Sequence, residues 1–260
     1  MAEPVLRMHG ERALVTGSTA GIGRAIAEMF AREGAAVCVT GRNAERGAAV
    51  VADIEAHGGT ATFVSARLDD ADDLAELVDR AAQALGGLTV LVNNAAGSEG
   101  GDGPVAELTD DAWDAAFRVN VTAPFRLCRA AIPHMRAAGH GAIVNISTRQ
   151  AERASKGFTA YVASKSALNG LTRAIAVDYG AENIRCNTIS PGYVLNRVRD
   201  ADISDERRLR YEGMHVTRLG VADDIAHAAV YLACKESEYL TGINLQLDGG
   251  GSIARGLVLG

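Results

Sequence analysis

The sequence predicts an α/β protein with a parallel, doubly wound sheet of about seven strands flanked by helices. Short apolar runs alternate along the chain with longer segments in which apolar residues recur at helical spacing. The short runs are apolar nearly throughout, as in strands that are covered on both faces, rather than at every second residue. The chain of 260 residues shows no repeat and no linker-like stretch, so we expect one domain over residues 1–260.

The expected strands are apolar runs bounded mainly by turn-forming residues: 12–16, 35–40, 61–64, 89–92, 142–146, 184–189 and 243–247. Helical patterns begin at Ile22, at 44, at 72, near Thr109, before Tyr161 and at 223. The Thr109 hydroxyl can cap a first turn that carries two aspartates. The polar, arginine-rich segment 193–215 is expected to form a solvated loop of mixed charge above the site.

Composition narrows the class of protein. Hydrophobic residues make up 48% and charged residues 22%, which is typical of soluble globular proteins. A net charge of −6 gives no electrostatic support to a nucleic-acid or anionic-membrane role. No apolar run approaches the roughly 18 residues of a membrane span, and Met1–Pro4 lacks a signal-peptide pattern. We therefore expect a cytoplasmic protein.

Cysteine and histidine spacing indicates no metal centre. Cys38, Cys128, Cys186 and Cys234 stand singly in apolar runs, as reduced core cysteines do. The six histidines show no paired ligand spacing. We predict no metal site.

A glycine-rich turn follows the first expected strand and opens the first expected helix. Gly17, Gly21 and Gly23 are spaced along it, and Thr16 precedes them. Glycines in such a turn allow the backbone to approach a pyrophosphate, and the amino end of a helix favours its negative charge. The pattern predicts dinucleotide binding.

The end of the second expected strand bears on the choice of cofactor. Gly41-Arg42 offers no carboxylate for a ribose 2′-hydroxyl, whereas an arginine can accommodate a 2′-phosphate. NADP is therefore favoured over NAD. The alternative is that Arg42 only caps a solvated turn.

Tyr161 and Lys165 lie one turn apart on the same face of an expected helix. A phenol has an ordinary pKa of about 10, and a nearby ammonium group lowers it by favouring the phenolate. The pair is therefore a candidate general acid/base. The alternative is a surface packing contact, for which this spacing is also common.

Several short motifs recur in a characteristic order: Thr16-Gly17, Gly21-Ile22-Gly23, Asn93-Asn94-Ala95, Asn120, Tyr161 with Lys165, Pro191-Gly192, Thr241-Gly242 and Asp248-Gly249-Gly250. In these motifs the sequence resembles the short-chain dehydrogenase/reductase family over essentially its whole length. It is most similar in kind to 3-oxoacyl-carrier-protein reductases and sugar dehydrogenases. The resemblance implies a seven-stranded Rossmann-like sheet, a nicotinamide cofactor and carbonyl/alcohol redox chemistry.

The resemblance also implies roles for particular residues. Tyr161 would exchange a proton with the substrate oxygen, and Lys165 would lower its pKa and hold the nicotinamide ribose. Asn120 would bend its helix and hold a water that relays protons to Lys165. Thr148 stands where the family usually has the catalytic serine, and Ser147 is the alternative.

The cofactor would contact residues from all the motifs: Gly17, Ser18, Thr19, Gly21, Ile22, Gly23, Arg42, Leu68, Asn94, Ala95, Tyr161, Lys165, Pro191, Gly192 and Val194. Three positions depart from the family pattern. Arg67 replaces a common aspartate near the adenine, Asn196 replaces a frequent threonine, and Ala96 replaces a glycine.

The substrate should lie beyond the carboxyl ends of the strands, between the segments 97–103, 149–158 and 193–215. Arg149, Arg153 and Lys156 outweigh Glu152 in the middle segment, so an anionic substrate is one possibility. Three functions stay open: an NADP-dependent reductase of an oxoacyl thioester, sugar or ring ketone; an NAD-dependent alcohol or polyol dehydrogenase; and a non-catalytic nucleotide sensor.

The helices from Thr109 and Thr159 carry apolar or small residues on more than one face: Trp113, Phe117, Phe125, Ile132, Ala167, Leu168, Leu171 and Ile175. A second apolar face left in water would be large for a monomer. We expect a homotetramer, with a dimer as the alternative, and the apolar tail 256–260 packed on a neighbouring subunit.

Overall fold

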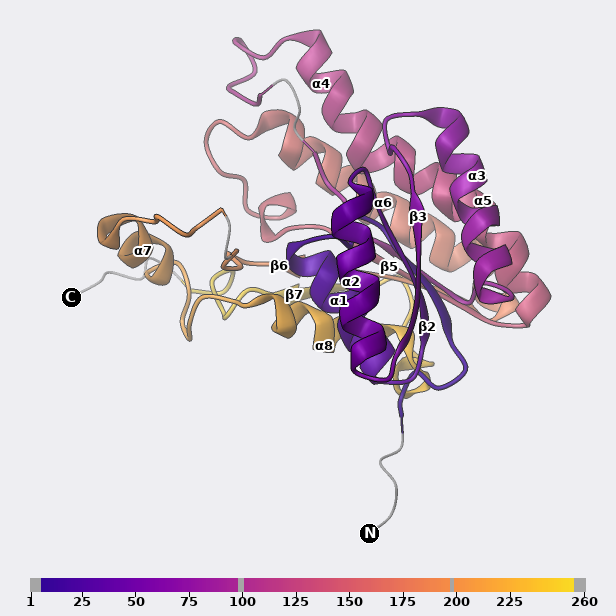
Figure 1. Cartoon of the computed structure of the whole chain (residues 1–260). Coiled ribbons are helices and arrows are strands. Elements are labelled where there is room, and N and C mark those ends of the chain that lie inside the picture. Colours follow the sequence, from indigo (N-terminus) through magenta and orange to yellow (C-terminus); the bar gives the residue numbers. More distant parts are fainter. Residues whose placement is uncertain (1–5, 98–100, 197–198, 255–260) are drawn as a thin grey trace.

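Seven parallel strands form one sheet in the order β3-β2-β1-β4-β5-β6-β7 in the computed structural model, which describes residues 6–97, 101–196 and 199–254 (Figure 1). The strands are β1 (Arg12–Val15), β2 (Ala36–Gly41), β3 (Thr60–Ser65), β4 (Val90–Asn93), β5 (Gly141–Ile146), β6 (Ile184–Pro191) and β7 (Asn244–Leu247). The predicted fold class is confirmed. The strand order reverses between β1 and β4, and in such sheets ligands bind beyond the carboxyl ends of the strands at that point.

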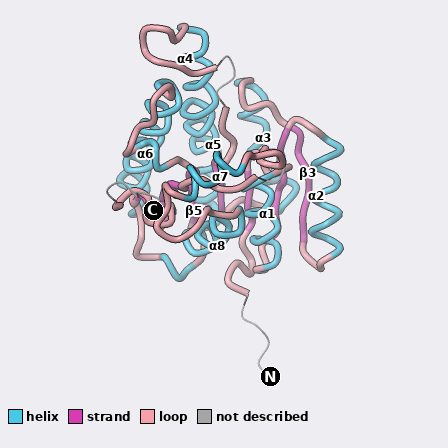
Figure 2. Tube along the Cα trace, turned by 90° about the vertical axis from the view of Figure 1, so that its left-hand side faces the viewer, coloured by secondary structure: helices cyan, strands magenta, loops and turns pink. Residues whose placement is uncertain are grey.

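Helices cover both faces of the sheet (Figures 1 and 2). One apolar cluster joins the sheet to α1 (Gly21–Arg32), α2 (Ala44–Ala56) and α8 (Ala222–Ala233). The other joins it to α3 (Ala71–Leu85), α5 (Ala123–Ala138) and α6 (Thr159–Tyr179). Among the described residues, no helix combines the length and apolar character that crossing a membrane would require.

Local sequence signals explain most of these elements. The stripe of Ile26, Met29 and Phe30 on α1 is buried against the sheet. Thr109 caps α4 (Asp110–Phe117), as predicted, because its hydroxyl oxygen accepts a hydrogen bond from the Ala112 amide at 3.2 Å. The four cysteines are buried and free, also as predicted.

The segment 193–215 differs from the expected loop, because it contains the helix α7 (Asp205–Glu212). Figure 1 shows α7 projecting beyond the ends of β6 and β7. No residue of α7 is buried, and its sequence has no stripe of apolar residues that would have predicted a helix. Its signals are the Ser204 cap and the two acidic residues of its first turn, which stabilise a helix start.

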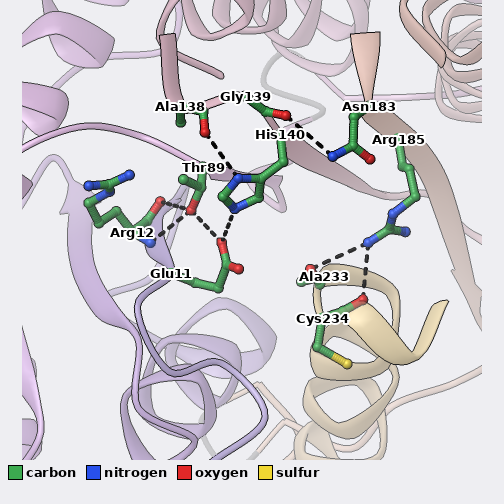
Figure 3. Close-up of polar contacts among 10 residues, drawn as sticks. All are labelled: Glu11, Arg12, Thr89, Ala138, Gly139, His140, Asn183, Arg185, Ala233 and Cys234. Carbon is green, nitrogen blue, oxygen red and sulfur yellow. Dashed lines mark hydrogen bonds and ion pairs between the residues drawn. The ribbon is translucent and has the colours of Figure 1, made fainter. Parts of the chain in front are cut away.

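Polar contacts tie together the segments at the amino ends of the central strands (Figure 3). The predicted site residues follow the carboxyl ends of the strands, so these contacts lie at the opposite edge of the sheet. The Glu11 carboxylate accepts a hydrogen bond from the Thr89 hydroxyl at 2.6 Å and lies 3.2 Å from His140 Nε2. The Arg185 guanidinium donates to the carbonyl oxygens at the end of α8. These groups are largely satisfied by one another, so this edge is a structural anchor.

The residues 98–100, 197–198 and 255–260 lie outside the described part of the chain. The expected contact of the tail 256–260 with a neighbouring subunit therefore lies outside the described residues, as do parts of two predicted substrate segments.

Candidate active site

The glycine-rich turn joins β1 to α1 and needs its glycines. Gly17 and Gly21 have φ values of +64° and +55°, in the left-handed region that side chains disfavour. A Cβ atom on Gly23 would lie 2.4 Å from both the Gly17 carbonyl oxygen and the Asn94 side chain. The turn therefore packs closely, with the amino end of α1 beside it.

The motifs after β1 and β4 hold each other in place at the switch in strand order. The Thr16 hydroxyl accepts hydrogen bonds from the Asn94 and Ala95 amides at 3.0 and 3.1 Å. In return the Asn94 side chain donates to the Thr16 and Gly17 carbonyl oxygens at 2.8 and 3.3 Å. Asn94 is thus a fixed part of the turn that it faces.

Three cavities meet at Asn94 along this edge of the sheet. The first, of about 360 Å³, includes Gly17, Thr19, Arg42, Leu68 and Ala95. The second, of about 230 Å³, lies at the start of α1 and includes Gly21, Ile22, Gly23, Val194 and Asn196. The third, of about 1020 Å³, includes Thr148, Tyr161, Lys165, Pro191 and Gly192. Their succession fits the adenosine, pyrophosphate and nicotinamide of a dinucleotide.

Ser18 is the one predicted cofactor residue that lines none of these cavities. Its side chain is fully buried. Its hydroxyl donates to the Val15 carbonyl oxygen at 2.6 Å and accepts from the Thr40 amide at 2.9 Å. The Ser18 amide also donates to the Thr40 carbonyl oxygen at 3.0 Å, so both the side chain and the amide fasten the turn to β2.

The first cavity, where the adenosine is expected, carries charges of both signs. Arg42 is exposed at its rim, and Asp69 lines the same cavity. Arg67, at the position of the family's aspartate, pairs with Asp69 at 3.0 Å and lines none of the three cavities. This pairing lowers the pKa of Asp69 and offsets its charge.

Thr148 lies beside Tyr161 in the largest cavity. Burial raises the pKa of Tyr161, and hydrogen bonding by the Thr148 side chain lowers it in part. Ser147 is 5% exposed and lines the same cavity, but its hydroxyl donates instead to the Lys165 carbonyl oxygen at 3.4 Å. The geometry thus brings together Thr148 and Tyr161 rather than Ser147 and Tyr161.

Lys165 is buried, and its ammonium donates to the Ile146 carbonyl oxygen at 2.8 Å. Burial lowers its pKa to about 8. The expected lowering of the Tyr161 pKa by Lys165 is wrong for this arrangement: burial dominates and raises that pKa, with Thr148 and then Arg199 opposing it.

Asn120 lies in a π-helical turn, Arg118–Thr122, between α4 and α5. Its carboxamide oxygen accepts from the Gly97 amide at 3.1 Å, and its nitrogen donates to the Gly97 carbonyl oxygen and the Ser164 hydroxyl. The side chain therefore clamps the segment after β4 onto α6. Because it lines none of the three cavities, its implied water-holding role stays a prediction.

Asp102 is a positioning residue that no pattern in the sequence predicts. The carboxylate accepts hydrogen bonds from the Ala160 and Tyr161 amides at 3.0 and 2.9 Å. It thereby caps α6, whose own flanking residue Phe158 supplies no side-chain cap. The contact spans distant parts of the chain, so no local pattern signals it.

The cations of segment 149–158 are mostly engaged with the main chain. Arg149 donates to the Met214 carbonyl oxygen at 3.1 Å, and Arg153 donates to the carbonyl oxygens of Gly251 and Ser252. Lys156 lines the large cavity together with residues of the α7 segment. Arg149 and Arg153 thus fasten neighbouring segments, while Arg149 and Lys156 still bring positive charge to the wall of the large cavity.

Comparison with known proteins agrees with this geometry. Residues 17–252 match the family model described as enoyl-(acyl carrier protein) reductase. The chain is 40% identical to a 7alpha-hydroxysteroid dehydrogenase of Clostridium sardiniense over 94% of each chain. It is 35% identical to the 2,5-dichloro-2,5-cyclohexadiene-1,4-diol dehydrogenase LinX of Sphingobium indicum, over 95% of this chain and 98% of LinX.

Solved structures give the same result. A protein of Sinorhizobium meliloti described as a short-chain alcohol dehydrogenase superimposes with a TM-score of 0.91 at 35% identity, over 97% of this chain and 100% of the other. A protein of Beutenbergia cavernae described as an NAD(P)-dependent gluconate 5-dehydrogenase, with NADP bound, has a TM-score of 0.88 at 33% identity, over 96% and 100%. The chain therefore belongs to the short-chain dehydrogenase/reductase family and is an oxidoreductase that acts on CH–OH groups.

Proposed function

We propose that the protein interconverts a secondary alcohol on a ring and the corresponding ketone, with NADP(H) as cofactor. The observation that carries this proposal is that Thr148, Tyr161 and Lys165 line one cavity, which continues into the glycine-rich cleft at Asn94. When bound, the nicotinamide gives or takes the hydride. The residues that would hold it come from the glycine turn, the β4 end and Pro191-Gly192.

Each catalytic side chain has a task that its position allows. Tyr161 gives a proton to the substrate oxygen during reduction and takes one during oxidation. The Thr148 hydroxyl, beside it, hydrogen-bonds to the same oxygen and orients it. Lys165 supplies a buried positive charge at the wall of the cavity and a donor for the ribose. Asp102 and Asn120 hold α6, and with it Tyr161, at this place.

A ring alcohol is the substrate class that the cavity and the relatives support together. The walls include the apolar or aromatic side chains of Phe158, Tyr193, Tyr211 and Met214. Two relatives are named for ring alcohols, a hydroxysteroid and a cyclohexadiene diol. The test is to follow nicotinamide absorbance with hydroxysteroids, cyclohexanols, polyols and oxoacyl thioesters. Turnover confined to open-chain polyols with NAD would favour the sugar-dehydrogenase alternative.

Arg42 is expected to set the cofactor preference. NADP should bind about 10–100-fold more tightly than NAD, because a guanidinium forms charge-assisted hydrogen bonds with a 2′-phosphate. Arg42→Ala should remove this preference and leave NAD affinity unchanged, as measured by fluorescence titration. Arg46→Ala, an exposed change on the neighbouring helix, is the control. Equal affinities for NADP and NAD in the unmodified protein would refute the assignment.

The hydroxyl at position 148, rather than at 147, is expected to matter for turnover. Thr148→Val keeps the shape of the side chain but removes the hydrogen bond, and kcat should fall about 10²-fold. Thr148→Ser should keep most of kcat. Ser147→Ala should change kcat little, since that hydroxyl contacts the Lys165 main chain. The reverse pattern, with only Ser147→Ala damaging, would show that Ser147 is the catalytic hydroxyl.

We also propose that the protein is a homotetramer, with a dimer as the alternative. Of the apolar residues singled out on the long helices, Ile132, Leu168 and Ile175 face the core. Trp113 and Phe125 are 37% and 45% exposed, and Val177 on α6 is 83% exposed. Exposed apolar side chains of this size favour association between copies. Phe125→Glu should therefore weaken assembly in light scattering, whereas Val105→Glu, elsewhere on the surface, should not. A 27.1 kDa species of the unmodified protein would contradict the proposal.

A further inference from the structure

We propose that His215 is a positioning residue that fastens the aromatic wall of the substrate cavity, an inference that rests on the proposed function of that cavity. His215 is 6% exposed and lies just after α7. Tyr193 and Tyr211, which it joins, both line the large cavity. They come from opposite ends of the 193–215 segment, one after β6 and one within α7.

The imidazole bonds the main chains of both tyrosines. Its Nε2 accepts from the Tyr193 amide at 3.1 Å, and its Nδ1 lies 2.8 Å from the Tyr211 carbonyl oxygen. An amide can only donate and a carbonyl can only accept, so the ring is neutral with its proton on Nδ1. The donor and the acceptor of a neutral imidazole point away from one another across the ring, which suits two main-chain groups on different sides of it.

Two glycines beside His215 leave the space that its imidazole ring occupies. A Cβ atom on Gly192 would lie 2.7 Å from His215 Nε2, and one on Gly249 would lie 3.3 Å from Cδ2. The glycine of Pro191-Gly192, which the family resemblance assigns to the cofactor, therefore also leaves room for the imidazole on its other side. His215 therefore packs against the residues that directly follow β6 and β7.

The two tyrosine rings that this link aligns are stacked. Their centroids are 3.9 Å apart and their planes differ by 19°. Arg199 lies over Tyr193 at 4.9 Å, and Arg207 lies over Tyr211 at 5.5 Å, so the stack has a guanidinium on each outer face. The Tyr193 hydroxyl also donates to Asp200 at 2.8 Å. The wall is thus one stacked unit, and the His215 bridge fixes its two backbones in register.

The consequence concerns substrate binding rather than the chemical step. His215 does not line the cavity with Tyr161, so it acts through Tyr193 and Tyr211. Losing the bridge releases α7 and its tyrosine, which loosens the wall that a ring substrate would contact. The hydrogen bonds that hold Lys165 and the glycine-rich turn do not involve His215 and remain in place.

The experiment compares His215→Ala, His215→Gln and the control His227→Ala, an exposed histidine at the rim of the adjoining cavity. His215→Ala should raise KM for a ring alcohol about 10-fold, with kcat and NADP affinity nearly unchanged. His215→Gln, which can keep one of the two bonds, should raise KM less. His227→Ala should leave KM as it is. An unchanged KM, or equal losses in kcat and cofactor affinity, would overturn the proposal.

A second measurement does not depend on turnover. Hydrogen exchange at the Tyr193 amide and through α7 should be about 10-fold faster in His215→Ala, while β1, β4 and β5 exchange as before. If the unmodified protein turned over no ring alcohol but this exchange changed as described, the proposed substrate would be wrong and the bridge right. Unchanged exchange in 193–215 would show that His215 does not fasten the segment.

Discussion

Tyr161→Phe is expected to lower kcat by about 10²–10⁴-fold while leaving NADP affinity unchanged. The substitution removes only the hydroxyl, which is the group that exchanges a proton with the substrate oxygen. The ring still packs against Phe158, whose centroid lies 6.4 Å away, and the Asp102 cap on the main chain remains. The kinetics are followed by nicotinamide absorbance, and cofactor binding by fluorescence.

The matched control is Tyr179→Phe, at the end of the same helix, where the ring lies under Arg136. This variant should turn over as the unmodified protein does. Turnover of Tyr161→Phe near the unmodified rate would show that another group moves the proton, and would refute the assignment of Tyr161 as the general acid/base.

Lys165→Met is expected to abolish most turnover and, at neutral pH, to make the fold more stable. Lys165 is 2% exposed, and burial lowers its pKa from 10.5 to about 8. That difference corresponds to about 3 kcal/mol of unfavourable charge burial, and the lost hydrogen bond to Ile146 offsets about 1 kcal/mol of the gain. The variant should therefore gain about 2 kcal/mol in unfolding free energy, measured by urea denaturation.

The pH dependence has a definite sign. At pH values well below 8 the lysine is charged in both the folded and the unfolded protein, so the full cost is present. Between 8 and 10.5 the folded lysine is neutral while the unfolded one still binds a proton, so the cost fades as pH rises. The advantage of Lys165→Met should thus be largest at neutral pH and small above pH 10.5. Lys235→Met, at an exposed lysine, should show neither effect. A variant less stable than the unmodified protein at every pH would contradict this account.

The fold could be predicted because its signals are local. Strands such as Val90–Asn93 and Gly141–Ile146 are fully buried, so burial on both faces makes them apolar throughout. Helix α7 was not predicted, because none of its residues is buried and it has no apolar stripe. The boundaries shifted by a residue or so where hydrogen bonding, rather than apolar character, ends an element, as at Thr16 and Thr89.

The candidate site likewise contains residues that local sequence patterns predict and residues that they do not. Gly17, Gly21 and Gly23 were found because a turn with left-handed backbone and close packing requires glycine at fixed spacing. Asp102 and His215 were not, because each acts on main-chain groups of another segment and only the folded chain shows the contact. The direction of the Tyr161 pKa was also missed, since the sequence shows a nearby lysine but not the burial that raises this pKa.

The central claim is that hydride moves between the carbinol carbon of a ring alcohol and NADP at the Tyr161 cavity. The most direct measurement uses a ring alcohol with deuterium on that carbon, together with oxidised NADP, and mass spectrometry of the nicotinamide. We predict one deuterium in each reduced cofactor, formed in step with the ketone by the unmodified protein and about 10²-fold or more slowly by Tyr161→Phe. Ketone without deuterated cofactor, or equal transfer by the two proteins, would contradict the account.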